Sequence, residues 1–355
     1  MDISKLDKNM ANREPEKDII WHDAGNLSIE GRGWNDTESR YDRLPVRARD
    51  TVPSPVWQLS KCPAGISVKF STNSTSLTVR WTGVSAMSHM AATGVSGVDL
   101  YVSHEGRWRW LAVGRPQYEL NETTMFDNLP SVKRNFMLYL PLYNSVRKVE
   151  LGILPSFEIE PLPPVVKKPI VFYGTSITQG GCASRPGMCY PSILGRWLEM
   201  PVINLGFSGN GNMDAGIMNL LCELDPLVYV LDCLPNMNES LVLERMENGI
   251  RKLRSARPEA HVVLVENILY CDSFLKKASM DHCISVNKVL SSIYAKLVRE
   301  GMKNLHYIKD TGFTGNDGES TVDGAHLTDL GYMRFSEKLF GPLKNILGEG
   351  TIDNH

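Results

Sequence analysis

The chain has 355 residues, of which 42% are hydrophobic and 22% are charged, as in a globular protein of roughly two domains rather than a disordered one. Its 38 Lys and Arg and 40 Asp and Glu leave a formal net charge of −2, without the basic excess of a nucleic-acid binder. No stretch reaches the length of about 18 apolar residues that a transmembrane helix needs, so we expect neither nucleic acid nor membrane as a partner.

The N-terminal segment, residues 1–16, is polar and charged and lacks the apolar stretch of a signal peptide. If the chain is complete, this predicts a cytoplasmic protein. If a leader has been removed, a periplasmic or secreted protein would have the same sequence, so both compartments stay open.

The first half of the chain alternates apolar and polar residues with a period of two. Residues 66–71 read Ile-Ser-Val-Lys-Phe-Ser, and residues 77–81 repeat the pattern. Such alternation sends one face of a strand to a core and the other to water. Further strands are expected at residues 98–102, 108–113, 136–140 and 146–153. Short strands at this spacing, with little helical pattern, predict an all-β sandwich, jelly-roll-like in character.

A proline-rich segment separates this half from the next. Residues 161–164 read Pro-Leu-Pro-Pro, which can continue neither a helix nor a central strand. We therefore place a domain boundary near residue 165. This gives a β-sandwich domain over residues 1–165 and a second domain over residues 166–355.

The second half alternates apolar strand-like runs with helix-length segments. Continuous apolar runs imply strands that are buried on both faces. The strands are expected at residues 170–173, 202–205, 227–231, 262–265 and 305–308, and the helices at residues 190–199, 214–223, 240–255, 274–300 and 328–347. Strand–helix units in succession predict a three-layer α/β/α domain around a five-stranded parallel sheet.

Side chains that can do chemistry follow these strands. In an open parallel sheet, ligands bind beyond the carboxyl ends of the strands. The loop after the first strand contains Ser176, the glycine-rich loop after the second contains Gly209, and the loop after the third contains Asn236. The fifth strand leads to Asp323 and His326. The sequence thus predicts that a hydroxyl, a backbone donor, an amide and an acid–imidazole pair meet at one edge of the sheet.

These loops, in this order, resemble the sequence blocks of the SGNH or GDSL-type hydrolases over roughly residues 169–345. The first domain has Gly-Val-Asp-Leu-Tyr at residues 97–101, which is similar to the GxDLY signature of a β-sandwich found ahead of some of these hydrolases. Two departures stand out. The usual Gly-Asp-Ser is Gly-Thr-Ser at residues 174–176, and the third block lacks the usual glycine before Asn236.

The resemblance implies a serine esterase that works through an acyl-enzyme. Ser176 would be the nucleophile, since a serine hydroxyl needs an adjacent base, and His326 would be that base. Asp323 would hold the imidazole in the required tautomer. The oxyanion hole would consist of the Ser176 and Gly209 backbone N–H groups with the Asn236 side chain. We expect no metal and no other cofactor.

Each of these residues has a plainer interpretation when it is taken alone. Ser176 could be a helix N-cap, Gly209 a turn glycine and Asn236 an Asx-turn residue. An aspartate three residues before one of eight histidines is unremarkable by itself. Their joint occurrence at successive strand ends favours the catalytic interpretation.

Residues outside these loops are expected to be structural. Histidines elsewhere in the chain fit surface or packing positions, with His89 the one candidate for the border of a cleft. Trp108 and Trp110 share one face of a predicted strand. They could stack on a sugar ring, but a half-buried position in the sandwich core is the better expectation. The seven cysteines include no CxxC pair, and Cys182 and Cys189 could form a disulfide or stay as free thiols.

The resemblance further implies a small-molecule or oligosaccharide ester as the substrate, with removal of small acyl groups, acetyl above all, from a carbohydrate. Two alternatives stay open. An acyltransferase would use the same triad, and a non-catalytic carbohydrate-binding protein could be built on a hydrolase scaffold. The intact set of Ser176, Asp323 and His326 argues against a pure binding protein.

Overall fold

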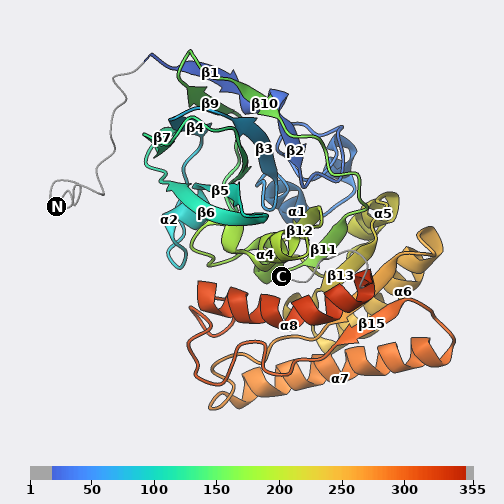
Figure 1. The fold of residues 1–355 in the computed structure, drawn as a ribbon. Helices are drawn as coiled ribbons and strands as arrows, with labels where there is room; N and C mark the ends of the chain where they lie inside the picture. The colour runs from blue at the N-terminus through green and yellow to red at the C-terminus, as the bar shows by residue number, and fades with distance from the viewer. Residues whose placement is uncertain (1–17, 349–355) are drawn as a thin grey trace.

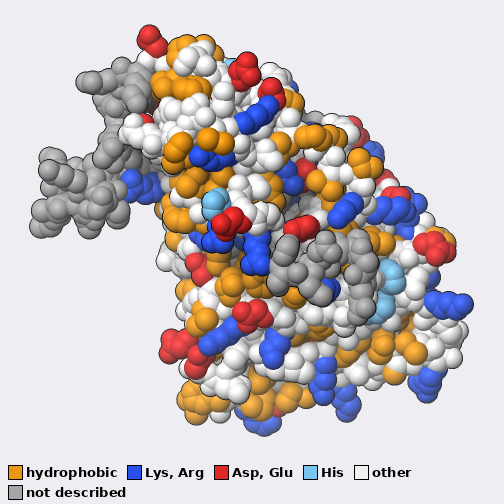
Figure 2. Space-filling view, in the orientation of Figure 1, with side chains coloured by type: hydrophobic (Ala, Val, Ile, Leu, Met, Phe, Trp, Pro, Cys, Tyr) orange, Lys and Arg blue, Asp and Glu red, His pale blue; other side chains and the backbone are white. Residues whose placement is uncertain are grey.

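The computed structural model describes residues 18–348 and shows a β-sandwich packed against an α/β domain (Figure 1). The segment 1–16, for which we expect no signal peptide, lies outside these residues. No helix within the described part of the chain is both long and apolar enough to cross a bilayer. On the face shown in Figure 2, acidic and basic side chains are interspersed rather than gathered by sign.

The N-terminal sandwich consists of two antiparallel sheets. In spatial order, one sheet contains β1 (Ile20–Asp23), β9 (Val149–Ile153), β4 (Leu77–Thr82) and β7 (Leu120–Phe126). The other contains β10 (Ile159–Pro161), β3 (Ser67–Thr72), β8 (Arg134–Tyr139), β5 (Val98–His104) and β6 (Arg107–Gly114), with β2 (Ser28–Glu30) paired to β3. Apolar side chains from both sheets, among them Phe70, Trp81 and Leu100, form one core between them.

The sandwich contains elements that the alternation did not predict. The strands β1, β2, β7 and β10 were not expected, nor were the short helices α1 (Ser54–Leu59) and α2 (Ala92–Val95). Strands β7 and β10 lie at sheet edges, where polar residues and a proline such as Pro161 are tolerated.

The α/β domain has the predicted five-stranded parallel sheet, which confirms the expected fold class. In spatial order its strands are β12 (Val202–Gly206), β11 (Ile170–Gly174), β13 (Val228–Asp232), β14 (His261–Val265) and β15 (Leu305–Ile308). Its helices are α3 (Ser176–Gln179), α4 (Tyr190–Trp197), α5 (Ala215–Glu223), α6 (Glu239–Ala256), α7 (Lys277–Arg299) and α8 (Asp329–Leu347).

The helices cover both faces of this sheet, which makes the domain three-layered (Figure 1). Alternate side chains of β11 point to opposite faces. Val171 and Tyr173 join the core beneath α5, α6 and α7, whereas Ile170 and Phe172 join the core beneath α4 and α8. Burial on both faces explains why the strands of this sheet are continuous apolar runs.

Arg43 ties the N-terminal part of the chain to the end of β12. The residue is 1% exposed, and its guanidinium donates from Nη1 to the carbonyl oxygens of Asn204 and Gly206, at 3.2 and 2.7 Å. It also donates to the carbonyl oxygens of Leu59 and Cys62. Burial lowers the pKa of Arg43 to about 10, so the group stays charged at neutral pH. A buried charge is tolerable here because several hydrogen bonds satisfy it.

Asp99, the acidic residue of the Gly-Val-Asp-Leu-Tyr motif, forms a second connection. Leu100 points into the sandwich core, so the alternation turns its neighbour Asp99 outward, toward the α/β domain. There the fully buried carboxylate accepts from Arg185 Nη1 and the Gly187 backbone N–H, both at 2.8 Å. It also accepts from Trp110 Nε1 at 2.9 Å. The motif therefore joins the two parts of the molecule.

The expectation that Trp108 and Trp110 lie in the sandwich core is wrong. Trp110 is 49% exposed, and Trp108 packs against a small cluster that contains Tyr101 and Tyr139. The register pairs Tyr101 with Trp110, so these rings share the outer face of the sheet. The alternation correctly predicts that the two tryptophans share one face of the strand, but it does not determine whether that face points to the core or outward.

Replacing Asp99 with alanine should destabilise the protein by about 3–5 kcal/mol, because it leaves the Arg185 charge without its partner at a buried interface. The matched control is Asp281→Ala, which removes an exposed ion pair with Lys277 and should cost about 0.5 kcal/mol or less. Urea unfolding midpoints measure both variants. Equal shifts in the two would mean that the Asp99 ion pair contributes no more than a surface pair.

Candidate active site

The three residues predicted to form a triad lie in one line of hydrogen bonds. Ser176 Oγ is 2.8 Å from His326 Nε2, although the two residues are 150 positions apart in the chain. On the other side of the ring, His326 Nδ1 is 2.7 Å from Asp323 Oδ2. Both distances are those of good hydrogen bonds. The arrangement can pass a proton from the hydroxyl to the imidazole while the carboxylate stabilises the resulting cation.

The turn after β11 presents Ser176. Thr175 is the N-cap of α3, and its side chain accepts from the Ile177 backbone N–H, so the N-cap interpretation of Ser176 is wrong. Ser176 is instead the first residue of the helix, with 7% of its surface exposed. Gly180 ends this single turn with a φ of +114°, a conformation that favours glycine.

A tight turn before α8 fixes Asp323 against His326. Asp323 Oδ1 accepts from the backbone N–H groups of Ala325 and His326, at 3.1 and 2.9 Å, and so leaves Oδ2 for the imidazole. Burial acts to raise the pKa of the Asp323 carboxyl, but these hydrogen bonds outweigh it and hold the pKa below its ordinary value. Asp323 is therefore an anion at neutral pH.

The glycine-rich loop after β12 packs against the Ser176 turn. The Ser208 backbone N–H donates to Gln179 Oε1 at 3.1 Å, and a Cβ added at Gly211 would lie 2.1 Å from the Gly174 carbonyl oxygen. Gly209 has a φ of +68°, and a Cβ added there would meet nothing within 4 Å. The turn-glycine interpretation thus holds for Gly209, and the space into which a side chain would project from this position is open.

Asn236 binds this same loop. Its side-chain Oδ1 accepts from the Gly211 backbone N–H at 3.1 Å, and this hydrogen bond holds the amide against the glycine-rich loop. Strands β12 and β13 flank β11 on either side, so the loops that contain Gly209 and Asn236 border the one that presents Ser176. The loops that the sequence grouped together are thus neighbours in the structure.

Asp232 is a buried acid beneath this site that sequence reasoning did not single out. Its Oδ2 accepts from Thr178 Oγ1 and the Tyr190 hydroxyl, each at 3.1 Å, and so ties α3 and α4 to the end of β13. Burial raises its pKa from 3.8 to about 6, although these hydrogen bonds act in the opposite direction. In the sequence, Asp232 is recognisable only as a single acidic residue at the end of an apolar strand.

The raised pKa of Asp232 makes folding depend on pH. Between pH 3.8 and about 6, the folded protein holds a proton that the unfolded chain has released. The stability contribution of this group therefore falls as the pH rises through that window, by about 3 kcal/mol in all. Asp232→Asn removes this ionisable group. The stability of the variant minus that of the wild type, measured from their urea midpoints, should therefore be larger at about pH 7.5 than at about pH 4. The same wild-type–variant difference at both pH values would contradict this.

The sandwich contributes His89 beside His326. The two rings lie 5.7 Å apart between centroids, with His89 exposed in the segment that precedes α2. This is the one histidine that we expected to border a cleft. Of the others, His261 and His306 contact each other at the amino ends of β14 and β15, away from the edge that presents Ser176.

Cys182 and Cys189 are both free thiols in the structure, which decides between the two interpretations of this pair. Cys182 Sγ donates to the His89 carbonyl oxygen at 3.3 Å, and Cys189 Sγ lies 3.1 Å from Ser192 Oγ. Burial, and to a smaller extent the charge of Asp323, raises the pKa of Cys182 to about 11. At neutral pH it is therefore a protonated, weakly reactive thiol.

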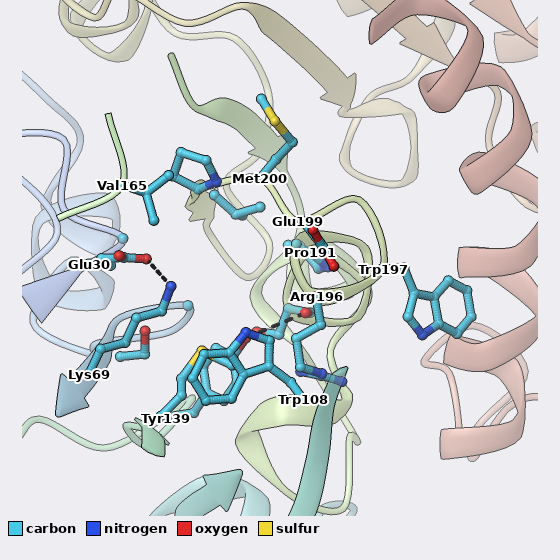
Figure 3. Close-up of a pocket in the computed structure, with 18 of the residues that line it drawn as sticks. Glu30, Lys69, Trp108, Tyr139, Val165, Pro191, Arg196, Trp197, Glu199 and Met200 are labelled. Atoms are coloured by element: carbon cyan, nitrogen blue, oxygen red, sulfur yellow. Dashed lines mark hydrogen bonds and ion pairs between the residues drawn. The ribbon is translucent and has the colours of Figure 1, made fainter. Parts of the chain in front are cut away.

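A separate cavity of about 670 Å³ lies between the outer face of the sandwich and α4 (Figure 3). Lys69 forms an ion pair with Glu30 at 2.6 Å on the sandwich side, and Arg196 lines the cavity from α4. Neither Ser176 nor His326 is among its lining residues. Ser176 and His326 therefore do not open into this cavity.

Comparisons with known proteins agree with this architecture. Residues 167–344 match the GDSL-like lipase/acylhydrolase family, and residues 19–159 match the N-terminus of SGNH-hydrolase-type esterases. No curated protein matches the chain. A solved structure of a GDSL-like lipase from Bacteroides ovatus is 30% identical, with a TM-score of 0.89 over 93% of this chain and 98% of that one.

Two more distant structures share the fold. The salicylyl-acyltransferase SsfX3 from a tetracycline biosynthetic pathway is 16% identical, with a TM-score of 0.77 over 94% of this chain and 99% of that one. A family two carbohydrate esterase from Clostridium thermocellum, in complex with cellohexaose, is 17% identical, with a TM-score of 0.60 over 80% of this chain and 93% of that one. Because the family model spans half of the chain and the Bacteroides structure matches nearly all of it, the protein belongs to the GDSL-like lipase/acylhydrolase family of ester hydrolases.

Proposed function

We propose that the protein is a serine esterase that removes small acyl groups, acetyl above all, from carbohydrate esters. The observation that supports this most directly is the line of hydrogen bonds from Ser176 through His326 to Asp323. A hydroxyl, an imidazole and a carboxylate in contact can generate a nucleophile at neutral pH. A protein that only bound carbohydrate would have no use for this arrangement.

The reaction would proceed in two steps. The Ser176 Oγ attacks the ester carbonyl carbon while His326 Nε2 accepts the hydroxyl proton. His326 then returns this proton to the sugar oxygen, which leaves as an alcohol, and the acyl group stays on Ser176. A water molecule, deprotonated by His326, attacks the acyl-enzyme, releases the carboxylic acid and restores the Ser176 hydroxyl.

The oxyanion of each tetrahedral intermediate would accept from the Ser176 and Gly209 backbone N–H groups and the Asn236 side chain. The support is the contact of the glycine-rich loop with the Ser176 turn and the hydrogen bond that holds the Asn236 amide against that loop. Donors of this kind are worth about 10²–10³ each in rate, because they bind charge that develops only in the transition state.

Carbohydrate as the substrate class draws support from the family two carbohydrate esterase, whose solved complex holds cellohexaose. Acyl transfer is the second candidate, because a salicylyl-acyltransferase shares the two-part architecture over nearly the whole chain. We also propose that the domains divide near residue 165. The two family matches end at residue 159 and begin at residue 167, and so support a boundary between them.

Assays with p-nitrophenyl acetate and acetylated xylo-oligosaccharides test this proposal. We expect release of acetate from both substrates. Hydrolysis should exceed acylation of added alcohol acceptors; transfer to an alcohol in preference to water would identify an acyltransferase. Tight binding of the glycan without turnover of any ester would identify a binding protein instead, and would overturn the esterase proposal.

A further inference from the structure

Three side chains that can bind metal ions lie close together, and one of them is His326, the imidazole of the proposed triad. The ligand atoms of His89, Cys182 and His326 all lie within 4.8 Å of one another. They come from three separate segments: the sandwich before α2, the chain just after α3, and the loop before α8. Two imidazoles and one thiol form a donor set that zinc and similar cations prefer.

The fold braces the segments that present these side chains. The Thr93 hydroxyl, four residues after His89, donates to the Ser184 carbonyl oxygen at 2.6 Å. A Cβ added at Gly94 would lie 2.0 Å from the Ala183 carbonyl oxygen, so the two backbones touch. Cys182 itself has a φ of +68°, a left-handed conformation that is uncommon for a residue other than glycine. Such strain persists only where the surroundings hold it in place.

We propose that His89, Cys182 and His326 form a binding site for Zn²⁺ or another thiophilic divalent cation, and that occupation of this site switches off the enzyme. Tetrahedral zinc with these ligands separates its ligand atoms by about 3.3–3.6 Å. The site must therefore contract by up to about 1.5 Å from the observed limit of 4.8 Å. Small side-chain rotations must supply this movement, and His89, which is exposed and lies in a short loop, has room to turn toward the other two ligands.

The triad itself supplies the supporting contact that zinc sites use. Asp323 holds His326 Nδ1, which leaves Nε2 as the ligand atom. A carboxylate behind the ligating imidazole fixes its orientation and raises its basicity. When the cation binds, the Cys182 thiol loses its proton to solvent, and the Nε2 lone pair forms a bond to the metal. No electron transfer is involved.

The cation inhibits the enzyme because it binds His326 Nε2. This half of the inference rests on the proposed function. Nε2 is the atom that lies 2.8 Å from Ser176 Oγ and would accept its proton. A metal-bound Nε2 has no lone pair to offer, so Ser176 loses its base. The cation would thus act as a reversible inhibitor, and a chelator would restore or raise the rate.

Metal binding can be measured without any substrate. The probe is Co²⁺ added to the Ser176→Ala protein, which keeps all three ligands and lacks the nucleophile. We expect thiolate-to-cobalt absorption in the near ultraviolet and the visible bands of a tetrahedral ion, both displaced by Zn²⁺. Adding Cys182→Ser should abolish the ultraviolet band, and adding His89→Gln should weaken Co²⁺ binding by at least about tenfold. Adding Cys222→Ser, which removes a thiol from α5, should change neither.

Activity assays then test inhibition in the wild-type protein. Zn²⁺ should inhibit hydrolysis of p-nitrophenyl acetate reversibly, and His89→Gln should need about tenfold more Zn²⁺ for half-inhibition of its own metal-free rate. Absence of the thiolate band in the Ser176→Ala protein would overturn the site. The band without inhibition of an active wild type would overturn the switch. If no ester is hydrolysed at all, the esterase proposal fails while the cobalt spectra still decide the metal site.

Discussion

Ser176→Ala should lower kcat/KM for p-nitrophenyl acetate by a factor on the order of 10⁴ or more. The variant keeps the backbone donors and the substrate-binding surface but loses the oxygen that lies 2.8 Å from His326 Nε2. Residual activity would then come from the oxyanion donors and binding alone. The loss should appear in kcat, because a hydroxyl that forms a bond only during reaction contributes little to ground-state binding.

The matched control for this variant is Ser292→Ala on α7, where the hydroxyl donates to the Lys288 carbonyl oxygen far from the site. It should retain the wild-type rate. Urea midpoints of both variants check that each is folded. Ser176→Ala turnover equal to that of the wild type would exclude Ser176 as the nucleophile.

Asp323→Asn should lower kcat by a factor on the order of 10³–10⁴ with little change in stability. An asparagine can still accept from the Ala325 and His326 backbone N–H groups, so the turn keeps its shape. The neutral amide, however, neither stabilises an imidazolium nor selects the tautomer whose Nε2 faces Ser176. The effect is therefore chemical rather than structural.

The pH dependence of this variant adds a second test. Hydrogen bonds hold the pKa of the Asp323 carboxyl below its ordinary value, so the wild-type group stays ionised from neutral pH well into acid. The loss of kcat in Asp323→Asn, relative to the wild type, should accordingly persist at every pH from about 5 to about 9. Asp317→Asn, which changes an acid paired with Arg334, serves as the control and should keep the wild-type kcat. A deficit below tenfold would mean that His326 does not depend on Asp323.

The α/β domain could be predicted closely from the sequence, because its central strands are buried on both faces. The expected strand at residues 170–173 is β11 (Ile170–Gly174), and the expected helix at 240–255 is α6 (Glu239–Ala256). The sandwich was harder. β7 (Leu120–Phe126) reads Leu-Asn-Glu-Thr-Thr-Met-Phe and forms at a sheet edge through pairing with β4. That pairing is a tertiary contact, which local sequence does not encode.

The proximity of the candidate site residues could be predicted from the parallel-sheet topology, since loops at the carboxyl ends of parallel strands share one edge of the sheet. The packing of the sandwich on that edge could not be anticipated. It places Asp99 against Arg185, and His89 against His326. Cys182 likewise joins the two histidines across long sequence separations, so no spacing motif reveals the cluster.

Whether His326 activates Ser176 is tested most directly by mass spectrometry of the intact protein after treatment with a fluorophosphonate, which reacts with activated serines. The wild-type protein should gain a single adduct that maps to the peptide containing Ser176. His326→Ala should react more slowly by a factor on the order of 10³ or more. Labelling of a different residue, or equal labelling rates in the two proteins, would contradict the assignment of Ser176 and His326 as nucleophile and base.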